Sequence, residues 1–281
     1  MKYADLHIHT IYSDSTATAT DVVARSVKEG LSAISITDHD TVEGIPSAVE
    51  EGNNHGLEVI PGIEMTSEID NREIHILGYF VDINHPFFLK KLEELKQIRI
   101  DRIYKMIEKL KELGITNLSA QEVIDFSGEG AVGRVHLATM LQKKGWVYSV
   151  SEAFYRYLGD DCPAYVSKFK FSPEEIVGII AKATGVPVLA HPHIYPTSEL
   201  EQFIASLADA GLRGLEIYYP GYSEKLTETY RGLADKFGLL CTGGSDDHGS
   251  AKEKSVIGKV KIPYECVEAL KQDKCQKENT T

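Results

Sequence analysis

The amino-acid sequence predicts an α/β protein in which a parallel sheet covered by helices is interrupted by one helical insertion. Short apolar runs alternate with helical patterns over most of the 281 residues, which is typical of parallel strands joined by helices. The alternation stops between residues 85 and 171, where only helical patterns follow one another. The length suits one large domain that carries an insertion.

Seven short runs rich in valine, isoleucine and leucine predict the strands, at residues 3–7, 32–37, 57–63, 74–80, 186–190, 214–218 and 238–243. Helices fit between most of these strands, at about residues 20–29, 45–54, 173–185, 198–210 and 223–237. The third of these helices carries a complete start signal, with Ser172 as N-cap, Pro173 at the first position and Glu175 at the third. Seven such strands could close into a barrel.

Residues 85–171 predict a helical insertion rather than a linker, because the stretch is rich in apolar residues. A long amphipathic helix begins near Pro86, a second helix opens with a capping box at Ser119, and the segments RVHLATMLQKK and SEAFYRYLG predict two more. We therefore expect a barrel domain from residues 1–84 and 172–281, with residues 85–171 as a lid or substrate subdomain. The C-terminal segment KQDKCQKENTT predicts a frayed polar tail.

Charge and cysteine usage limit the classes of partner. The net charge is −12, and a uniformly acidic surface would repel nucleic acid, so no stable nucleic-acid complex is expected. The insertion carries 14 basic and 11 acidic residues, whereas the remainder carries 16 basic and 31 acidic residues. We expect metal-binding carboxylates among the acidic residues of the remainder. No apolar run approaches the ~18 residues of a membrane span, the N-terminus lacks a signal-peptide pattern, and the four scattered cysteines fit a reduced cytoplasm.

The segment Asp5-Leu6-His7-Ile8-His9-Thr10 places two histidines on one side of the first predicted strand, because side chains alternate along a strand. An isolated pair of this kind is more often exposed than metal-binding, so the rest of the chain must decide. Most other candidates follow the C-terminal end of a predicted strand, while one begins a strand: His39, Glu64, His191, Asp246 and His248, with His75 at a strand start. Active sites of parallel α/β folds form at that edge, so we expect these side chains to converge.

This mixture of imidazoles and carboxylates predicts a hydrolytic metal site. Imidazole and carboxylate groups suit Zn, Mn or Fe, and a carboxylate can bridge two ions. Cysteine is absent from the set, which favours a hydrolytic centre over a structural zinc site. Two or more ions a few ångströms apart can generate hydroxide and neutralise the charge of a phosphate. His55 and His85 lie in polar, loop-like segments and are not assigned to the site.

Six motifs resemble, in order along the chain, those of the PHP (polymerase and histidinol phosphatase) family: DLHIHTIYSDST, ITDHDTVEG, PGIEMT, IHILGYF, LAHP and GGSDDHG. The match runs over nearly the whole chain. The resemblance implies a distorted (β/α)7 TIM-like barrel with a trinuclear site for two to three divalent ions of Mn, Fe or Zn. Within the family, the motifs DHDT and IHILGYF and the insertion are most similar to stand-alone metal-dependent phosphoesterases that act on nucleoside 3′,5′-bisphosphates and short oligonucleotides.

Carried over position by position, the resemblance implies three metal positions: His7, His9, Glu64 and Asp246 for the first; Glu64, His75 and His191 for the second; Asp14, His39 and His248 for the third. The chain departs from the family pattern at Ser15, Ala19 and Val135, where the family often has Gly, Pro and Pro. These departures affect loop shape more than metal ligands, so they weaken the substrate assignment more than the chemistry.

Four residues are candidates for substrate contacts. Arg134, in the net-positive insertion, is a candidate clamp for a second phosphate, and a plain surface salt bridge is the alternative. His136 is a candidate to assist it. Ser13 and Tyr12 lie beside the predicted metal loop and are candidates for phosphate contact.

Two further residues are candidates for catalysis. His193, in the segment AHPH, is the candidate general acid, and a solvated or ligand-orienting histidine is the alternative. Asp38 is a candidate for orienting ligand imidazoles, and an ordinary turn residue is the alternative. Lys168 and Lys170 are candidates for the cleft wall, although lysines are more often solvated.

The predicted function is hydrolysis of the 3′-phosphate of nucleoside 3′,5′-bisphosphates. The same site could release mononucleotides from the 5′ end of short 5′-phosphorylated RNA, since both reactions hydrolyse a 3′ ester next to a 5′-phosphate. Histidinol phosphatase activity and a non-catalytic, metal-stabilised scaffold are the remaining alternatives. The expected partner is a small phosphorylated nucleotide or short oligonucleotide, with no membrane, and the oligomeric state stays open.

Overall fold

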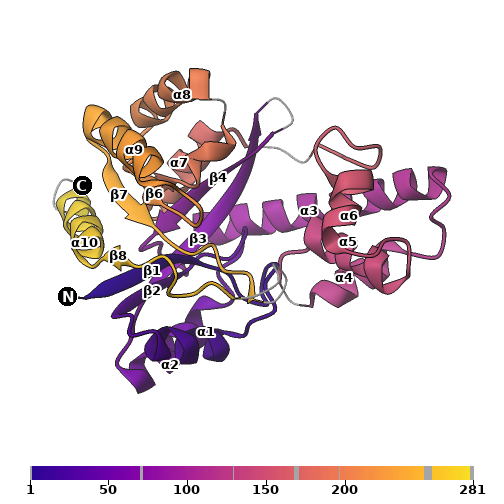
Figure 1. Cartoon of the computed structure of the whole chain (residues 1–281), viewed down its shortest axis with the longest axis horizontal. Coiled ribbons are helices and arrows are strands. Elements are labelled where there is room, and N and C mark those ends of the chain that lie inside the picture. Colours follow the sequence, from indigo (N-terminus) through magenta and orange to yellow (C-terminus); the bar gives the residue numbers. More distant parts are fainter. Residues whose placement is uncertain are drawn as a thin grey trace.

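The computed structural model describes residues 2–69, 72–128, 130–167, 171–195, 197–249 and 255–278. Eight of its strands form one sheet in the order β7-β6-β5-β4-β3-β2-β1-β8 (Figure 1). Their bounds are Tyr3–Ile8 (β1), Ala33–Ile36 (β2), Glu58–Ile69 (β3), Arg72–Tyr79 (β4), Val186–Leu189 (β5), Gly214–Tyr218 (β6), Leu240–Gly243 (β7) and Ile262–Pro263 (β8). All seven predicted strands are present, and the two-residue β8 was not predicted.

Strand β4 runs against its neighbours, so the prediction of an all-parallel sheet is wrong at this position. The pairs β1–β2, β2–β3, β5–β6 and β6–β7 are parallel, whereas β4 pairs antiparallel with both β3 and β5. Only residues 70–71 separate β3 from β4, and a parallel crossover needs about a dozen residues or more. The short β8 also pairs antiparallel, with the start of β1.

The chain after β7 returns to β1 and nearly closes the sheet into a barrel. The backbone N–H of Asp246 donates to the carbonyl of His7 at 2.8 Å, and that of His9 donates to the carbonyl of Asp247 at 3.0 Å. Gly244 permits this approach, because a Cβ there would lie 2.3 Å from the backbone nitrogen of His7. The distorted barrel that the sequence predicts is therefore confirmed.

Helices pack around this barrel, with bounds of Ala19–Lys28 (α1), Ile45–His55 (α2), Pro173–Lys182 (α7), Thr197–Asp209 (α8), Glu224–Phe237 (α9) and Glu265–Glu278 (α10). The predicted start signal of α7 is confirmed, since the Ser172 hydroxyl accepts from the N–H of Glu175 in a complete capping box. The predicted frayed tail is wrong as far as residue 278. Buried Val267 and Leu270 hold α10 against the barrel.

The predicted helices of the insertion are also present, with bounds of Pro86–Glu112 (α3), Ala120–Ser127 (α4), Arg134–Lys143 (α5) and Val150–Ala153 (α6), the last continued by a π-helical turn at Phe154–Leu158. Figure 1 shows α3 running out of the barrel towards α4, α5 and α6. The first turns of α3 bury Phe88 and Leu92 in the barrel core, whereas Ile103 and Leu110 pack in a separate core of the insertion. Residues 85–171 as a subdomain stay a prediction, because the packing divides within α3.

No helix in the described part of the chain combines the length and the apolar character needed to cross a membrane.

Candidate metal centre

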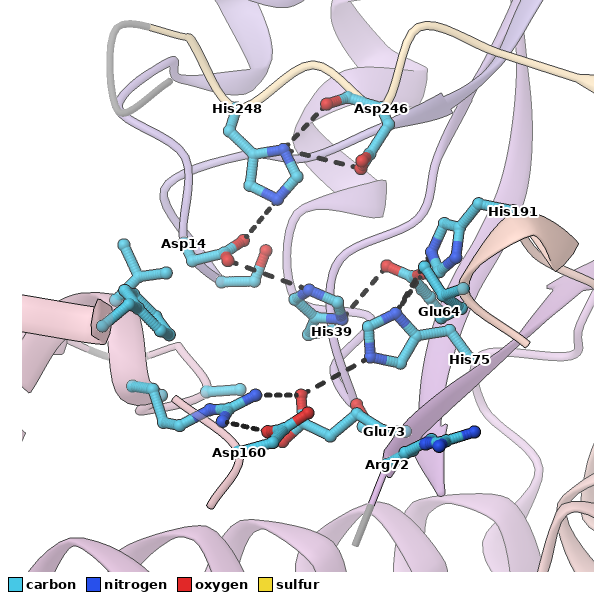
Figure 2. Close-up of a pocket in the computed structure, with 18 of the residues that line it drawn as sticks. Asp14, His39, Glu64, Arg72, Glu73, His75, Asp160, His191, Asp246 and His248 are labelled. Carbon is cyan, nitrogen blue, oxygen red and sulfur yellow. Dashed lines mark hydrogen bonds and ion pairs between the residues drawn. The ribbon is translucent and has the colours of Figure 1, made fainter. Parts of the chain in front are cut away.

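A cavity of about 660 Å³ opens between the mouth of the barrel and the insertion. The barrel contributes His39, which follows β2, and His191, which follows β5, while the insertion contributes Arg134 and Phe154. Figure 2 shows the histidines and carboxylates of the barrel gathered at one side of this space. The edge of the barrel at which the parallel strands end is thus the wall of a cavity.

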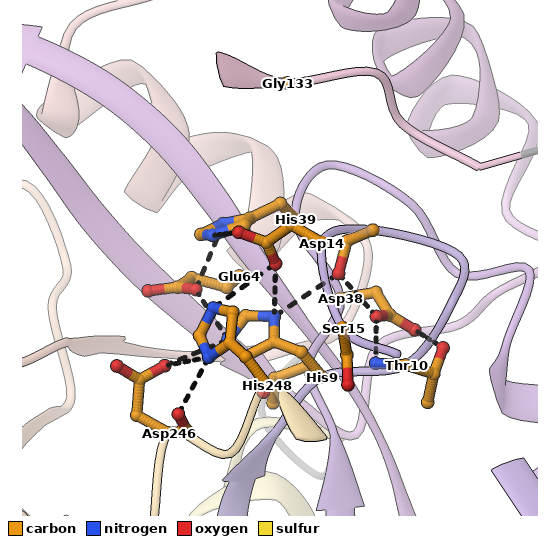
Figure 3. A network of polar contacts seen from close by, with 12 residues as sticks. His9, Thr10, Asp14, Ser15, Asp38, His39, Glu64, Gly133, Asp246 and His248 are labelled. Atoms are coloured by element: carbon orange, nitrogen blue, oxygen red, sulfur yellow. Dashed lines mark hydrogen bonds and ion pairs between the residues drawn. The ribbon is translucent and has the colours of Figure 1, made fainter. Parts of the chain in front are cut away.

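The structure brings all nine predicted ligands together. Their side-chain ligand atoms form three groups within 4.8 Å: His7, His9, Glu64 and Asp246; His39, Glu64 and His75; and His9, Asp14, His39 and His248. His191 joins the second group, because its Nε2 lies 3.0 Å from Oε1 of Glu64. Figure 3 shows His9, His39 and Glu64 close together, with Asp14, Asp246 and His248 around them. Compared with the predicted sets, His9 and His39 each stand near two groups rather than one.

The reversed direction of β4 explains why His75 belongs to the cluster although it lies near the start of a strand. In an antiparallel strand the first residues lie at the edge where the neighbouring strands end. His75 pairs across the sheet with Thr66, near the end of β3, and its carbonyl accepts from the N–H of Ala190, just after β5. Its Nδ1 accordingly lies 2.8 Å from Oε1 of Glu64.

The arrangement of these atoms fits divalent metal ions. Seven buried atoms of the cluster have no hydrogen-bond partner among the described residues: Nε2 of His7, His9 and His75, Nδ1 of His39 and His191, Oδ1 of Asp14 and Oε2 of Glu64. Such orphaned atoms cost about 1–3 kcal/mol each unless something else binds them. Nε2 of His9 lies 3.2 Å from both Glu64 Oε2 and Asp246 Oδ1. Two ligand atoms that each lie about 2.1 Å from one tetrahedral ion are about 3.4 Å apart, so the spacing of these atoms suits a shared ion.

Hydrogen bonds on the outer side of two rings set their tautomers. The carboxylate of Glu216 lies 3.0 Å from Nδ1 of His7 and can only accept, so Nδ1 carries the proton and Nε2 offers its lone pair to the cluster. The backbone carbonyl of Asp246 likewise accepts from Nδ1 of His248 at 2.8 Å. The freed Nε2 of His248 lies 3.2 Å from Asp14. Partners of this kind orient metal ligands in proteins.

Backbone strain is concentrated beside the same atoms. His191 and Asp246, two of the predicted ligands, have φ values of 25° and 50°, and Asp40, next to His39, has φ of 52°. A non-glycine residue in this left-handed region costs about 1–3 kcal/mol and persists where the surrounding structure enforces it. Two of these three residues, His191 and Asp246, carry side chains of the cluster, while Asp40 binds Arg99 beside it.

Without metal, two histidines of the cluster, His9 and His75, hold protons. Burial opposes the imidazolium, but the adjacent carboxylates of Asp246 and Glu64 raise the pKa of His9 to about 9. Burial also opposes the charge of His75, while Glu64 raises its pKa to about 9. Burial would raise the pKa of Glu64 itself, but His75 and His39 hold it well below its usual range. Imidazolium groups therefore take the place of cations around these carboxylates.

Asp38 does not line the cavity and instead fixes the loop that carries Ser13. Its carboxylate accepts from the N–H and the hydroxyl of Thr10 and from the hydroxyl of Ser13, each at 2.6 Å. Ser13 lines the cavity, and its Oγ lies 3.4 Å from Nδ1 of His9. Asp38 can therefore orient a predicted ligand only through Ser13, and its catalytic role stays a prediction.

Tyr12 lies outside the cavity lining, at the junction with the insertion. Its carbonyl accepts from the N–H of Ala131 at 2.8 Å, and a Cβ on Gly130 would lie 2.0 Å from that carbonyl oxygen. Tyr12 therefore joins the metal loop to the insertion, and nothing here tests its predicted contact with phosphate. Lys168 and Lys170, which were predicted as residues of the cleft wall, lie outside the described residues.

Arg134 lines the cavity, but carboxylates already surround its guanidinium. One terminal nitrogen donates to Asp160 at 2.7 Å and the other lies 3.0 Å from Glu73 (Figure 2).

His136 is buried and does not line the cavity. Its Nδ1 accepts from the N–H of Gly133 and caps α5, so the structure gives it a local role while its predicted contact with substrate stays untested.

His193 also lines the cavity, at the side of His191. Its Nδ1 lies 2.8 Å from the hydroxyl of Tyr222, and its ring centroid lies 5.1 Å from that of Tyr219. The Tyr219 hydroxyl donates to Oδ2 of Asp246 at 2.7 Å. Burial and the neighbouring His191 lower the pKa of His193. The lowered pKa favours the neutral imidazole of His193.

Sequence reasoning missed two buried charged groups that support the site. Glu216 is fully buried, and a lone acid in the apolar strand GLEIY was the signal for it. Arg99 is also buried, donates to Asp40 at 2.7 Å and to Thr66 at 3.0 Å, and contacts the carbonyl of Val132. Its signal was a cation on the apolar stripe of the long helix, two turns after Leu92.

Comparison with known proteins identifies what this chain is similar to. The family model described as PHP domain matches residues 5–109. The 5′-3′ exoribonuclease Rnm of Salmonella typhimurium is 33% identical over 87% of the chain and 84% of the relative. The 3′,5′-nucleoside bisphosphate phosphatase of Chromobacterium violaceum is 28% identical over 92% of the chain and 91% of the relative. The crystal structure of a protein from Bifidobacterium adolescentis, described as a metal-dependent phosphoesterase, matches with a TM-score of 0.85 and 26% identity, over 95% of the chain and 94% of that structure.

Proposed function

The chain belongs to the PHP domain family and is a phosphoric ester hydrolase, and from that premise we propose that it removes the 3′-phosphate from nucleoside 3′,5′-bisphosphates. One observation carries the proposal. Seven of the nine clustered histidine and carboxylate side chains line one cavity, His7 and His9 complete the cluster beside it, and the arginine-bearing wall of the insertion closes its other side. Such a cavity suits a substrate with a reacting phosphate and a second phosphate at a distance from it.

The nine clustered residues would hold the metal ions, and the orphaned buried atoms among them support this. Divalent ions bound there would lower the pKa of water and neutralise charge on the phosphoryl oxygens. Zn, Mn and Fe all suit this donor set, and we propose two to three ions. Glu216 fixes the ring of His7 from outside the cluster.

Arg134 is the proposed partner of the second phosphate. Its guanidinium lines the cavity, and the carboxylate of Asp160 that it contacts is 42% exposed. A phosphate group with more charge can replace that carboxylate on the same donors, while Glu73 keeps the guanidinium in place. Ser13, whose hydroxyl is already oriented by Asp38, is the nearer candidate for the reacting phosphate.

His193 is the proposed donor of the proton to the departing 3′ oxygen. Because its lowered pKa favours the neutral imidazole, His193 must first take up a proton from solvent before it can deliver one to the leaving oxygen. Substituting His193→Gln is expected to lower kcat for an alkoxide leaving group far more than for a phenolate, which leaves without a proton. Equal losses with both leaving groups would remove His193 from proton transfer.

A second candidate function is stepwise release of mononucleotides from the 5′ end of short 5′-phosphorylated RNA. Two observations favour it. The cavity lining also includes His193, Ile194 and Tyr219, which follow or contact the cluster residue His191. A relative that is 33% identical is named a 5′-3′ exoribonuclease. Both reactions break the bond between phosphorus and a 3′ oxygen, so the same residues serve both.

A direct assay separates the proposals. Purified, metal-replete protein is offered a nucleoside 3′,5′-bisphosphate, a 5′-phosphorylated oligonucleotide and histidinol phosphate, with the variant Asp14→Asn as the inactive control. We expect kcat/KM for the bisphosphate to exceed that for histidinol phosphate by at least about tenfold, a difference of about 1.4 kcal/mol in transition-state binding.

A preference for histidinol phosphate would overturn the proposed substrate. Turnover of no phosphoric ester in the presence of Mn, Fe or Zn would favour the scaffold alternative instead. A cytoplasmic location stays a prediction, which the four free cysteines support.

A further inference from the structure

We propose that the end of the cavity beside the β3–β4 hairpin is a subsite for the nucleotides that follow the scissile bond. Arg72 there binds the next phosphate, and Ile194 with Tyr219 contacts the intervening base. The inference rests on the proposed function and deepens it, because it makes a single-stranded oligonucleotide of three or more nucleotides the substrate that fills the cavity.

Arg72 is the one cavity-lining arginine that makes no ion pair with any described residue. Four arginines line the cavity: Arg72, Arg99, Arg102 and Arg134. Arg99 is paired with Asp40, and both Arg102 and Arg134 lie within 3.0 Å of Glu73. The guanidinium of Arg72 is exposed, and no ion pair with a described residue occupies its donors. A phosphate gains most from such a donor, since it displaces no carboxylate.

Arg72 lies at a separate end of the cavity from the carboxylate partner of Arg134. In Figure 2, Arg72 is drawn on the same side as His191, which lies two residues before His193. Figure 2 shows Arg72 and Asp160, the partner of Arg134, on opposite sides of the Glu73 side chain.

An apolar platform lines the same end. Ile194 is 41% exposed, although it lines a cavity whose other walls are mostly charged or polar. Next to it, the rings of His193 and Tyr219 lie 5.1 Å apart, and the Tyr219 hydroxyl is anchored on Asp246. A fixed aromatic face beside an exposed aliphatic side chain suits a nucleobase, which stacks without regard to sequence.

The chemistry of the reaction assigns the order of the substrate. Water forms the new bond to phosphorus, the bond to the 3′ oxygen of the first nucleotide breaks, and that oxygen takes a proton. Phosphorus stays attached to the second nucleotide, whose base therefore lies towards Ile194. The phosphate after the second nucleotide then reaches Arg72. A dinucleotide fills the platform only, whereas a trinucleotide fills both parts.

The test compares Arg72→Ala and Ile194→Ser on a 3′,5′-bisphosphate, a 5′-phosphorylated dinucleotide and a 5′-phosphorylated trinucleotide. The Arg72 variant is expected to lose about tenfold more kcat/KM on the trinucleotide than on the other two substrates. Its salt dependence on the trinucleotide should become shallower by about 0.7 in log–log slope, as for one lost phosphate contact. Ile194→Ser should lower kcat/KM severalfold more for both oligonucleotides than for the bisphosphate.

Matched control variants and a binding measurement separate an effect on the subsite from a general effect on the protein or on turnover. Arg25→Ala and Val27→Ser remove an exposed arginine and an exposed aliphatic side chain from α1, whose residues do not line the cavity, and should leave all three activities unchanged. Fluorescence anisotropy of a labelled 5′-phosphorylated trinucleotide on chelator-treated protein reports binding without turnover. Arg72→Ala should raise its Kd about tenfold.

Two results would overturn the subsite. Equal losses on all three substrates would place Arg72 at the scissile or terminal phosphate, and no loss on the trinucleotide would remove it from binding. Both results leave the proposed function intact if wild-type protein hydrolyses the bisphosphate. Failure of the wild type on the bisphosphate and both oligonucleotides would instead refute the proposed function, whatever Arg72 does in the binding measurement.

Discussion

Replacing Glu216 with glutamine tests how much the protein outside the cluster contributes to metal binding. Glu216 is fully buried, its Oε1 accepts from Nδ1 of His7 at 3.0 Å, and its Oε2 accepts from the N–H of His191 at 2.7 Å. Glutamine has one acceptor oxygen and one NH2 donor, so one of these two donors would face another donor. A buried donor without an acceptor costs about 1–3 kcal/mol, which is about 5- to 150-fold in an equilibrium constant. Loss of a partner that orients a metal ligand typically lowers metal affinity about 10- to 100-fold, which agrees with this range.

The assay is a metal titration against a chromophoric chelator of known affinity. We expect the Kd of the tightest site to rise about 10- to 100-fold in Glu216→Gln. Glu228→Gln, on the exposed side of α9, is the matched control and should leave the Kd unchanged. A Glu216→Gln protein that binds metal within twofold of wild type would refute the idea that His7 needs an outer carboxylate.

Three further predictions follow from the site. Arg134→Ala should raise KM about 10- to 100-fold for a 3′,5′-bisphosphate and much less for a simple phosphate monoester, as steady-state kinetics would measure; equal effects would remove the clamp. Because the folded pKa values of His9 and His75 are about 9, against about 6.5 when unfolded, their contribution to the stability of chelated protein is complete below pH 6.5. The Tm of chelated protein should therefore fall as the pH rises from 6.5 to 9, and a rise over that range would contradict the assignment. Arg99→Met should lower the free energy of unfolding by about 3–5 kcal/mol in denaturant titrations, since it leaves Asp40 charged and buried; a loss under about 1 kcal/mol would mean that the ion pair contributes little.

Local patterns explain why so much of the site could be predicted. Two-residue spacing puts His7 and His9 on one side of a strand, and the end of a parallel strand fixes where Glu64 and His191 lie. These rules need no knowledge of contacts between distant segments. The strand positions and the convergence of the candidates at the ends of parallel strands followed from them, while the full set of nine came from the family resemblance.

What could not be predicted depends on register and on contacts across the fold. The direction of β4 decides that His75 joins the cluster, and it follows from a tight connection rather than from the strand's own residues. The two-residue β8 is too short to carry a periodic pattern. α10 forms because its buried residues find a partner surface, although its own sequence is weakly amphipathic.

Contacts between side chains far apart in the sequence could not be predicted either, because they depend on how distant segments pack together. Arg134 was predicted as a phosphate clamp from its chemistry, but its contact with Glu73 joins residues on α5 and β4 that no local pattern relates. The same holds for Glu216 and His7, which are 209 positions apart. That Arg72 pairs with no described residue could be recognised only after the other cavity arginines had been matched with their carboxylates.

Anomalous X-ray diffraction from crystals of the protein soaked in Mn²⁺ or Zn²⁺ tests the central claim most directly. The account predicts two or three peaks at the wall of the cavity, each about 2.0–2.3 Å from side-chain atoms of one of the three groups of clustered histidines and carboxylates. Strong anomalous peaks only at other places on the protein, or none in the cavity at saturating metal, would contradict it.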